Sequence, residues 1–235
     1  ITATPIGNLG DMSPRAVEVL KEAELIAAED TRNTIKLLNH FEIKTPMTSY
    51  HEFNRFDKAD ELVEKMLEGT DVAIVTDAGT PCISDPGEVL VQKCVEAGIE
   101  VTSIPGPSAV ITALTLSGFS VRRFVFEGFL PPKQKKRDRK EAIDRIRNET
   151  GTIVLYEAPH RLKETLKELA GVFGPERRIA MCREMTKKHE EVIRTTIGEA
   201  AEREPRGEYV LVIEGKSRQA VEQEAREKWE ELSVE

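Results

Sequence analysis

Aromatic residues and long apolar runs are scarce in this 235-residue chain. Phe, Trp and Tyr make up 5% of the sequence, and hydrophobic residues make up 39%. No apolar run reaches the length of a membrane-spanning helix and no signal-peptide pattern occurs, so we expect a globular, cytoplasmic protein. The length suits one large domain or two domains of common size. Because the chain begins at Ile1 without a methionine, we expect the native N-terminus to precede it.

The cysteines and histidines lack the spacing of a disulfide framework or a metal site. The three cysteines are odd in number and form no Cys-x-x-Cys pair, so we expect reduced thiols in or near the core. The four histidines are scattered and show no paired ligand spacing, so no metal is predicted. These residues are Cys82, Cys94, Cys182, His40, His51, His160 and His189.

Several well-known nucleotide-binding and hydrolase motifs are also missing. No Gly-x-Gly-x-x-Gly follows the first expected strand, and no Gly-x-x-x-x-Gly-Lys-Ser/Thr occurs, which disfavours an NAD or ATP site. No Gly-x-Ser-x-Gly is present, which disfavours a serine hydrolase.

Hydrophobic periodicity predicts strands that alternate with helices up to Gly118. Runs such as "LIAAE", "DVAIVTD" and "IEVTSIPG" are typical of buried parallel strands, and Ser13-Pro14 is typical of a helix start. The second half predicts a mixed α/β domain with antiparallel pairing. We therefore expect an α/β fold with a boundary near residues 118–122: a domain at 1–118 with a mostly parallel sheet, and a domain at 119–235 ending in a charged helix over 219–235.

Six loops rich in glycine, proline or charge follow expected strands: "TPIGNLGD", "EDTR", "TDAGTPCISDPG", "PGPSA", "YEAPHR" and "REMTKKHE". In an open α/β sheet, ligands bind at the carboxyl ends of the strands, and glycine lets backbone approach them closely. Any one loop is better explained as a turn, and we expect Asp85 to cap a helix that starts at Pro86. Together the six favour a site for a small polar molecule with an adenosine or amino-acid part.

The charge is unevenly spread along the chain. The net charge is -8, yet residues 133–147 carry eight cationic and three acidic side chains. Most charge runs are solvated helix faces, but a local cationic excess in an acidic chain is also typical of phosphate binding. Pro131 and Pro132 would present this segment as an arm.

Seven motifs, in order between Thr4 and about Gly215, resemble the ribosomal RNA small subunit methyltransferase I family of the tetrapyrrole methylase superfamily. They are "TPIGNLGD", "EDTR", "DAGTPCISDPG", "PGPSA", "FLPPK", "YEAPHR" and "REMTKKHEE". The resemblance implies a two-domain, class III (tetrapyrrole methylase-like) α/β methyltransferase that binds S-adenosylmethionine (SAM) in the cleft between domains and forms a homodimer. It further implies methyl transfer to the ribose 2'-hydroxyl of a cytidine in 16S rRNA of the small ribosomal subunit.

The resemblance also implies which residues contact the cofactor. These are Leu9, Thr80, Pro81, Ile83, Ser108, Ala109, Tyr156, Met185 and Tyr209. Small-molecule methylases of the superfamily typically have Gly-Asp-Pro where this chain has Gly79-Thr80-Pro81, so no aspartate role transfers to Thr80.

Methyl transfer to a hydroxyl requires in-line geometry and a route for the departing proton. Candidate bases at loop ends are Glu29, Asp30, Asp77, Glu157, His160, Glu184 and Lys187, of which Asp77, Glu157 and Glu184 are our catalytic candidates. The RNA-binding candidates are Arg32, Lys133, Lys135, Lys136, Arg137 and Arg161, although arginines next to carboxylates are explained equally well as structural ion pairs. Tyr50, Phe53, Phe129 and Tyr156 are possible stacking partners for a cytidine, with Phe129 expected in the core.

Two other functions fit the same motifs. One is a small-molecule methylase of this fold acting on a tetrapyrrole, which would not need the basic arm. The other is a noncatalytic RNA-binding or ribosome-assembly factor that retains the fold.

Overall fold

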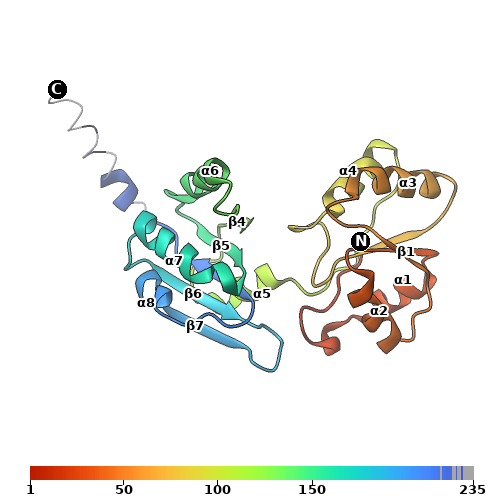
Figure 1. The fold of residues 1–235 in the computed structure, drawn as a ribbon, viewed down its shortest axis with the longest axis horizontal. Helices are drawn as coiled ribbons and strands as arrows, with labels where there is room; N and C mark the ends of the chain where they lie inside the picture. Colours follow the sequence, from red (N-terminus) through yellow and green to blue (C-terminus); the bar gives the residue numbers. More distant parts are fainter. Residues whose placement is uncertain (218, 224–225, 227–228, 230–235) are drawn as a thin grey trace. The chain divides into compact units, whose positions relative to one another are not determined.

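The computed structural model describes residues 1–217, 219–223, 226 and 229. The chain forms two compact units, Ile1–Ala109 and Val110–Glu235 (Figure 1). Most of the charged helix expected over 219–235 lies outside the described residues. Among the helices of the described ranges, none combines the length and apolar character needed to cross a membrane.

The first unit is built around a parallel sheet of strands in the order β2-β1-β3. Its strands are β1 (Leu25–Ala28), β2 (Met47–Ser49) and β3 (Val72–Val75). Its helices are η1 (Leu9–Asp11), α1 (Pro14–Glu22), α2 (Thr31–His40), α3 (Arg55–Leu67) and α4 (Gly87–Glu96). The expected start of α1 is confirmed, because the Ser13 hydroxyl accepts the Ala16 N–H and Pro14 occupies the first turn.

The expected strand at 99–106 is reduced to an isolated bridge with Thr2, beside β3. Thr2 donates to the Ile74 carbonyl (3.0 Å) and pairs in parallel with Ile104. Pro105 follows Ile104 directly and has no N–H to donate, so the pairing cannot continue past that bridge. The prediction of a regular strand over 99–106 was therefore wrong, although the segment does run along the sheet.

Helices cover both faces of this sheet. Ile26 and Ala28 point toward α1 and α2, whereas Ala27 and Ile74 point toward α3 and α4. Figure 1 shows these helix pairs on opposite sides of the strands. This burial on both faces is why the strands read as continuous apolar runs rather than as alternating ones.

The second unit contains a five-stranded sheet in the order β4-β5-β8-β6-β7. Only β4 and β5 pair in parallel, and the other pairs are antiparallel, as expected for this half of the chain. The strands are β4 (Phe124–Phe129), β5 (Thr152–Glu157), β6 (Arg178–Arg183), β7 (Glu191–Thr196) and β8 (Tyr209–Ile213). The helices are α5 (Ala109–Ser117), α6 (Lys136–Ile146), α7 (Pro159–Phe173) and α8 (Ile197–Ala201).

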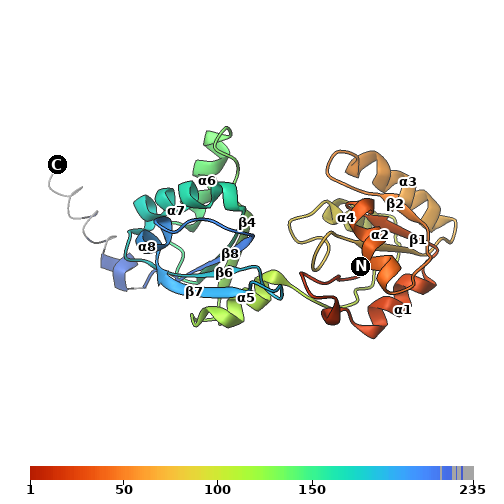
Figure 2. The same ribbon diagram turned by 60° about the horizontal axis from the view of Figure 1, so that its bottom comes forward.

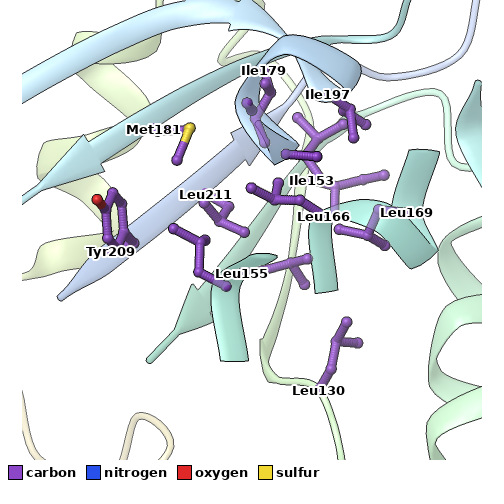
Figure 3. Close-up of a cluster of buried hydrophobic side chains, with 14 of the residues drawn as sticks. Leu130, Ile153, Leu155, Leu166, Leu169, Ile179, Met181, Ile197, Tyr209 and Leu211 are labelled. Carbon is purple, nitrogen blue, oxygen red and sulfur yellow. The ribbon is translucent and has the colours of Figure 1, made fainter. Parts of the chain in front are cut away.

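Helices also lie on both faces of the second sheet. Figure 2 shows α6, α7 and α8 on one face and α5 on the other. The core under α6, α7 and α8 is a cluster of buried aliphatic side chains, with Leu155, Leu166 and Leu211 near its centre (Figure 3).

Helix α5 belongs to the second unit rather than the first. The Arg194 guanidinium donates to the Leu116 and Ser117 carbonyls, and the Cys182 thiol contacts the Ala113 carbonyl at 3.7 Å. The division therefore falls at the start of α5, after its first residue Ala109, whereas the sequence placed the boundary at residues 118–122, after the helix. Gly118 follows the end of α5, and the sequence pattern predicted the domain boundary at this helix end. The contacts of α5 with the second unit are not visible in the sequence.

Candidate cofactor and substrate site

The loops that the sequence singled out in the first unit lie at one edge of its sheet. Strands β1 and β3 run parallel, and so do the bridged segments at Thr2 and Ile104. The loops that follow these four segments therefore start at their carboxyl ends. In open α/β sheets this edge is where ligands bind. The placement of these loops thus agrees with the expectation drawn from the strand ends.

Three of these loops are tied to one another by hydrogen bonds. Thr4 and Gly79 exchange both backbone hydrogen bonds (2.9 and 3.0 Å), and the Thr80 hydroxyl donates to the Pro107 carbonyl (3.0 Å). Gly79 has a φ of 89°, and a Cβ at that position would lie 3.2 Å from Ile6 Cγ2. Only glycine fits this junction without displacement, so the loops form a fixed platform.

The segment after this junction is held in an uncommon backbone conformation. Cys82 and Ser84 have φ values of 73° and 63°, in the left-handed region that ordinary residues avoid. The Asp85 carboxylate accepts the Gly87 N–H (2.8 Å), the first N–H of α4, while its Oδ2 is buried and has no hydrogen-bond partner among the described residues. Asp85 was expected to be the N-cap of a helix starting at Pro86, but the helix begins at Gly87 with Pro86 as its N-cap, so that expectation was wrong; Asp85 lies one residue earlier and accepts the Gly87 N–H.

The expected cofactor contacts of the first unit differ in what they offer. Leu9 and Ile83 are 43% and 47% exposed, so both leave apolar surface uncovered. The Thr80 hydroxyl is already used within the protein, and Pro81 is buried. Ser108 and Ala109, both half-buried, lead into α5.

Asp77 lies beside two other acidic residues at this edge. Glu29 accepts hydrogen bonds from the Thr76 hydroxyl (2.6 Å) and the Asp77 N–H (3.3 Å), and Asn33 donates to the Asp77 carboxylate (3.4 Å). Partial desolvation raises the pKa of Asp77, and the charge of Glu29 raises it further. Hydrogen bonds from Asn33 and the Asp30 backbone oppose this shift but do not cancel it, and a carboxylate with a raised pKa is better suited to accept a proton.

Asp30 and Arg32 form a local pair. Asp30 accepts the Arg32 N–H at the start of α2, and the Arg32 guanidinium donates to both carboxylate oxygens (3.0 and 2.7 Å). These bonds lower the pKa of Asp30 to about 2. Arg32 is 87% exposed, so it has room for an additional anion while it holds Asp30.

Glu157, at the end of β5, is buried and fully engaged. It is 2% exposed, accepts from the Thr165 hydroxyl (2.5 Å) and the Ala158 N–H (2.9 Å), and lies 3.4 Å from the Arg161 guanidinium. Both of its oxygens therefore have partners inside the second unit. This arrangement is that of a structural carboxylate.

Arg161 also contributes to local structure. Its guanidinium donates to the Leu130 carbonyl and is 24% exposed as a side chain. Arg139, which the sequence grouped with the basic arm, is 4% exposed and donates to the Pro131 carbonyl (2.7 Å) and Glu168 (2.7 Å). The two arginines thus hold the "FLPPK" loop that precedes α6.

Glu184, at the end of β6, is tied to the loop before β8. It accepts from the Glu208 N–H (2.9 Å) and the Lys187 ammonium (3.2 Å), and these interactions lower its pKa. A Cβ on Gly207 would lie 2.6 Å from its side chain, which shows how closely the two loops approach. Desolvation opposes the charge on Lys187, but hydrogen bonds to Glu208 and Glu184 raise its pKa overall, so it stays protonated.

The remaining expected contacts of the second unit are largely buried. Met185 and Tyr209 are each 6% exposed, and the Tyr209 hydroxyl accepts the Arg206 N–H (3.2 Å). Tyr156 is half-buried and packs against Phe126 and Phe129 with ring centroids 5.0 and 5.3 Å apart. Phe129 is 53% exposed, so its expected place in the core was wrong. Its side chain points to the solvent side of an edge strand.

Two of the other possible stacking residues have opposite environments. Tyr50 is 1% exposed and donates its hydroxyl proton to the Pro86 carbonyl (2.9 Å), so its ring belongs to the core. Phe53 is 97% exposed and lies after the carboxyl end of β2. Phe53 is thus available to a base, whereas Tyr50 is not.

The profile of the Tetrapyrrole (Corrin/Porphyrin) Methylases matches residues 1–201. Curated relatives called "Ribosomal RNA small subunit methyltransferase I" align over most of the chain. The relative from Synechocystis is 52% identical, over 92% of this chain and 78% of the relative. The relative from Bacillus subtilis is 44% identical, over 100% of this chain and 80% of the relative. The chain belongs to this family. The resemblance stated from the motifs is thereby confirmed.

Solved structures agree on the fold. Diphthine synthase aligns with a TM-score of 0.71 over 92% of this chain and 90% of that chain, at 14% identity. Uroporphyrin-III C-methyltransferase from Thermus thermophilus, complexed with S-adenyl homocysteine, aligns with a TM-score of 0.62 over 91% and 90%, at 15% identity. The expected tetrapyrrole methylase-like α/β fold is confirmed. At these identities the likeness concerns the fold alone.

Proposed function

We propose that this chain transfers a methyl group from SAM to the ribose 2'-hydroxyl of a cytidine in 16S rRNA. The observation that carries the proposal is the 44–52% identity, over most of the chain, to relatives named ribosomal RNA small subunit methyltransferase I. We further propose that the chain acts in the cytoplasm, as a homodimer, on the small ribosomal subunit.

The loop platform of the first unit is suited to SAM. When bound, SAM supplies a methyl group on a positively charged sulfur. Leu9 and Ile83 offer exposed apolar surface to it, and the left-handed residues Cys82 and Ser84 fix the path of the adjoining backbone. Ser108 and Ala109, with Thr80 and Pro81, would complete the contacts of this unit. Tyr156, Met185 and Tyr209 would supply those of the second.

Asp77 is the best-suited proton acceptor among the three catalytic candidates. Its carboxylate is exposed, its pKa is raised, and its one side-chain hydrogen bond is long (3.4 Å). A base whose pKa lies nearer the working pH accepts a proton more effectively. We propose that Asp77 would receive the 2'-hydroxyl proton as the 2'-oxygen takes the methyl group in line and the methyl–sulfur bond breaks, which would leave S-adenosylhomocysteine.

Glu157 and Glu184 act through structure in this proposal. Both carboxylate oxygens of Glu157 contact Thr165, Ala158 or Arg161. Glu184 accepts a hydrogen bond from the Glu208 N–H and so holds that loop. Their contribution is to position the strand ends that carry Tyr156 and Met185. Both oxygens of Glu157 have partners, and hydrogen bonds from the Glu208 N–H and Lys187 lower the pKa of Glu184, whereas the pKa of Asp77 is raised.

The test is to incubate the purified chain with SAM and unmethylated 30S subunits. We expect one new ribose methylation on a 16S cytidine by mass spectrometry of nuclease fragments. Methylation of a tetrapyrrole instead would establish the small-molecule alternative. SAM binding with methylation of neither substrate would refute the substrate, and absence of SAM binding would favour a noncatalytic assembly factor.

A further inference from the structure

We propose that the groove between α6 and α7 binds the phosphate backbone of the RNA substrate. This inference rests on the proposed function and deepens it by naming a contact surface. The groove has a volume of about 820 Å³ and lies entirely within the second unit. It includes residues of α7 that the sequence did not associate with RNA.

The groove is lined mainly by cations. Seven cationic and three acidic side chains contribute to its walls. The cations are Lys133, Lys136, Arg139, Lys140, Arg147, Lys163 and Lys167, and the acids are Asp144, Glu164 and Glu168. A concave surface with an excess of one charge concentrates its potential and attracts the opposite charge.

The acidic residues of the groove already have cationic partners. Glu168 pairs with the buried Arg139 (2.7 Å), Glu164 with Lys133 (3.1 Å), and Asp144 lies 4.0 Å from Arg147. Lys163 lies 3.7 Å from Glu204, outside the groove. Within the part of the chain that the structure describes, no ion pair is found for Lys136, Lys140 or Lys167. The unmatched positive charge of the groove is therefore carried by these three lysines.

The three lysines stand on both walls of a rigid groove. Lys136 and Lys140 are four residues apart on α6, so they point the same way one turn apart, and Lys167 is on α7. The Arg139 guanidinium, between them in sequence, fastens α6 to the Glu168 and Thr165 side chains of α7 (2.7 and 3.0 Å). The spacing of the lysines is thus set by the fold before any ligand arrives.

Charge favours RNA as the occupant. Residues 1–109 carry nine Lys or Arg and 19 Asp or Glu, a net charge of -10, whereas residues 110–235 carry 25 and 23, a net charge of +2. The net charge of the first group of residues repels a polyanion, whereas the local cationic groove of the second attracts it. Lysines act on phosphates as point charges without reading sequence, so the groove would hold the RNA while other residues select the nucleotide.

The test compares the wild-type chain with the triple variant Lys136→Gln, Lys140→Gln, Lys167→Gln. The probe is a radiolabelled, unmodified 16S rRNA fragment, measured by filter binding over a series of KCl concentrations. We expect at least about a 10-fold loss of affinity at low salt, and a slope of log K against log salt that is smaller by ~2, because each lost phosphate contact removes ~0.7–0.9.

The matched control is Lys21→Gln, Lys44→Gln, Lys65→Gln, which makes the same change in net charge. These lysines lie in the first unit at the amino end of its sheet, where α1 and α3 end and β2 begins. We expect wild-type affinity and slope for this control. Equal losses in both variants, or no loss in the groove variant, would overturn the proposed site.

Failure of the groove and failure of the proposed function give different results. Calorimetric titration with SAM and methylation of 30S subunits by the wild type test the function alone. If the wild type methylates normally and the groove variant keeps its salt slope, the function stands and the groove is refuted. If the wild type methylates nothing but the groove variant loses RNA affinity, the groove stands without the function.

Discussion

Hydrogen bonding distinguishes the three carboxylates that the sequence could not rank. Glu157 and Glu184 each accept at least two hydrogen bonds or ion pairs, whereas Asp77 has one long side-chain contact. Carboxylates follow many strands, and the sequence does not reveal which of them the folded chain has already used. Asn33, the partner of Asp77, was missed for the same reason: the two residues are far apart in sequence.

Replacing Asp77 with Asn removes the proposed proton acceptor with little change in shape. We expect kcat for 30S methylation to fall by about 10²-fold or more, because general bases contribute on that scale. SAM affinity, measured by calorimetry, should remain near the wild-type value. The control is Asp71→Asn, since Asp71 precedes the amino end of the same strand, β3. Equal activity in the two variants would rule out Asp77 as the base.

Replacing Glu29 with Gln tests the electrostatic setting of Asp77. Desolvation raises the pKa of Asp77 and the charge of Glu29 adds to it, so neutralising Glu29 lowers that pKa. Asp77 then becomes ionised at lower pH, and the acidic limb of the kcat profile should move to lower pH. Methylation rates measured across the acidic range give the midpoint. A shift to higher pH would contradict the assignment.

The elements around the site owe their geometry to a small number of interactions between loops and helices. In the first unit, Thr4, Gly79 and Thr80 join three loops to one another. In the second unit, Arg139 joins α6, α7 and the loop at Pro131. Each junction joins residues that are distant in sequence. Local sequence patterns therefore identify the loops and helices but do not show the hydrogen bonds between them.

The Gly79 junction predicts that Gly79→Ala and Gly69→Ala differ in function more than in stability. Both glycines have positive φ, so each substitution should cost about 1 kcal/mol of unfolding free energy in urea titrations. A Cβ at Gly79 would also press on Ile6, whereas a Cβ at Gly69 has no heavy atom within 4 Å. We expect weaker SAM binding only in Gly79→Ala. Equal SAM affinity in the two variants would show that the loop platform is not part of the cofactor site.

The Arg139 junction predicts a large stability difference between neighbouring arginines of α6. Arg139→Ala leaves buried acceptors unpaired and should cost roughly 2–4 kcal/mol of unfolding free energy. Arg137→Ala loses one exposed pair with Glu141 and should cost less than ~0.5 kcal/mol. Urea unfolding followed by circular dichroism measures both. Similar values would show that the buried network contributes little.

At the scale of the whole molecule, charge is divided between the two parts of the chain. The -10 of residues 1–109 and the +2 of residues 110–235 sum to the acidic total, which conceals the basic groove. Binding to a polyanion therefore depends on the local cations of the groove, because the net negative charge of the chain repels the polyanion. Salt should affect the two ligands of the proposed reaction differently.

We expect RNA affinity of the wild-type chain to fall steeply between about 50 and 200 mM KCl, since counterion release dominates such binding. SAM binding should change by less than about twofold over the same range, because the proposed contacts of SAM are apolar side chains and backbone groups. Filter binding and calorimetry supply the two affinities. A salt-independent RNA affinity would argue against recognition through phosphates.

The sequence by itself determined the alternation of strands and helices, the edge at which the loops gather, and the family. Apolar periodicity and turn residues are local signals, and the order of the motifs is visible along the chain. The elements and the family can therefore be predicted without the tertiary structure. The folded arrangement was needed to show that α5 packs in the second unit, that Glu157 and Arg161 bond to neighbouring groups, and that Lys167 shares a groove with Lys136 and Lys140. Those outcomes depend on contacts between residues that are distant in sequence. Hydrogen bonds and burial in the folded chain determine which polar groups remain free to contact a ligand.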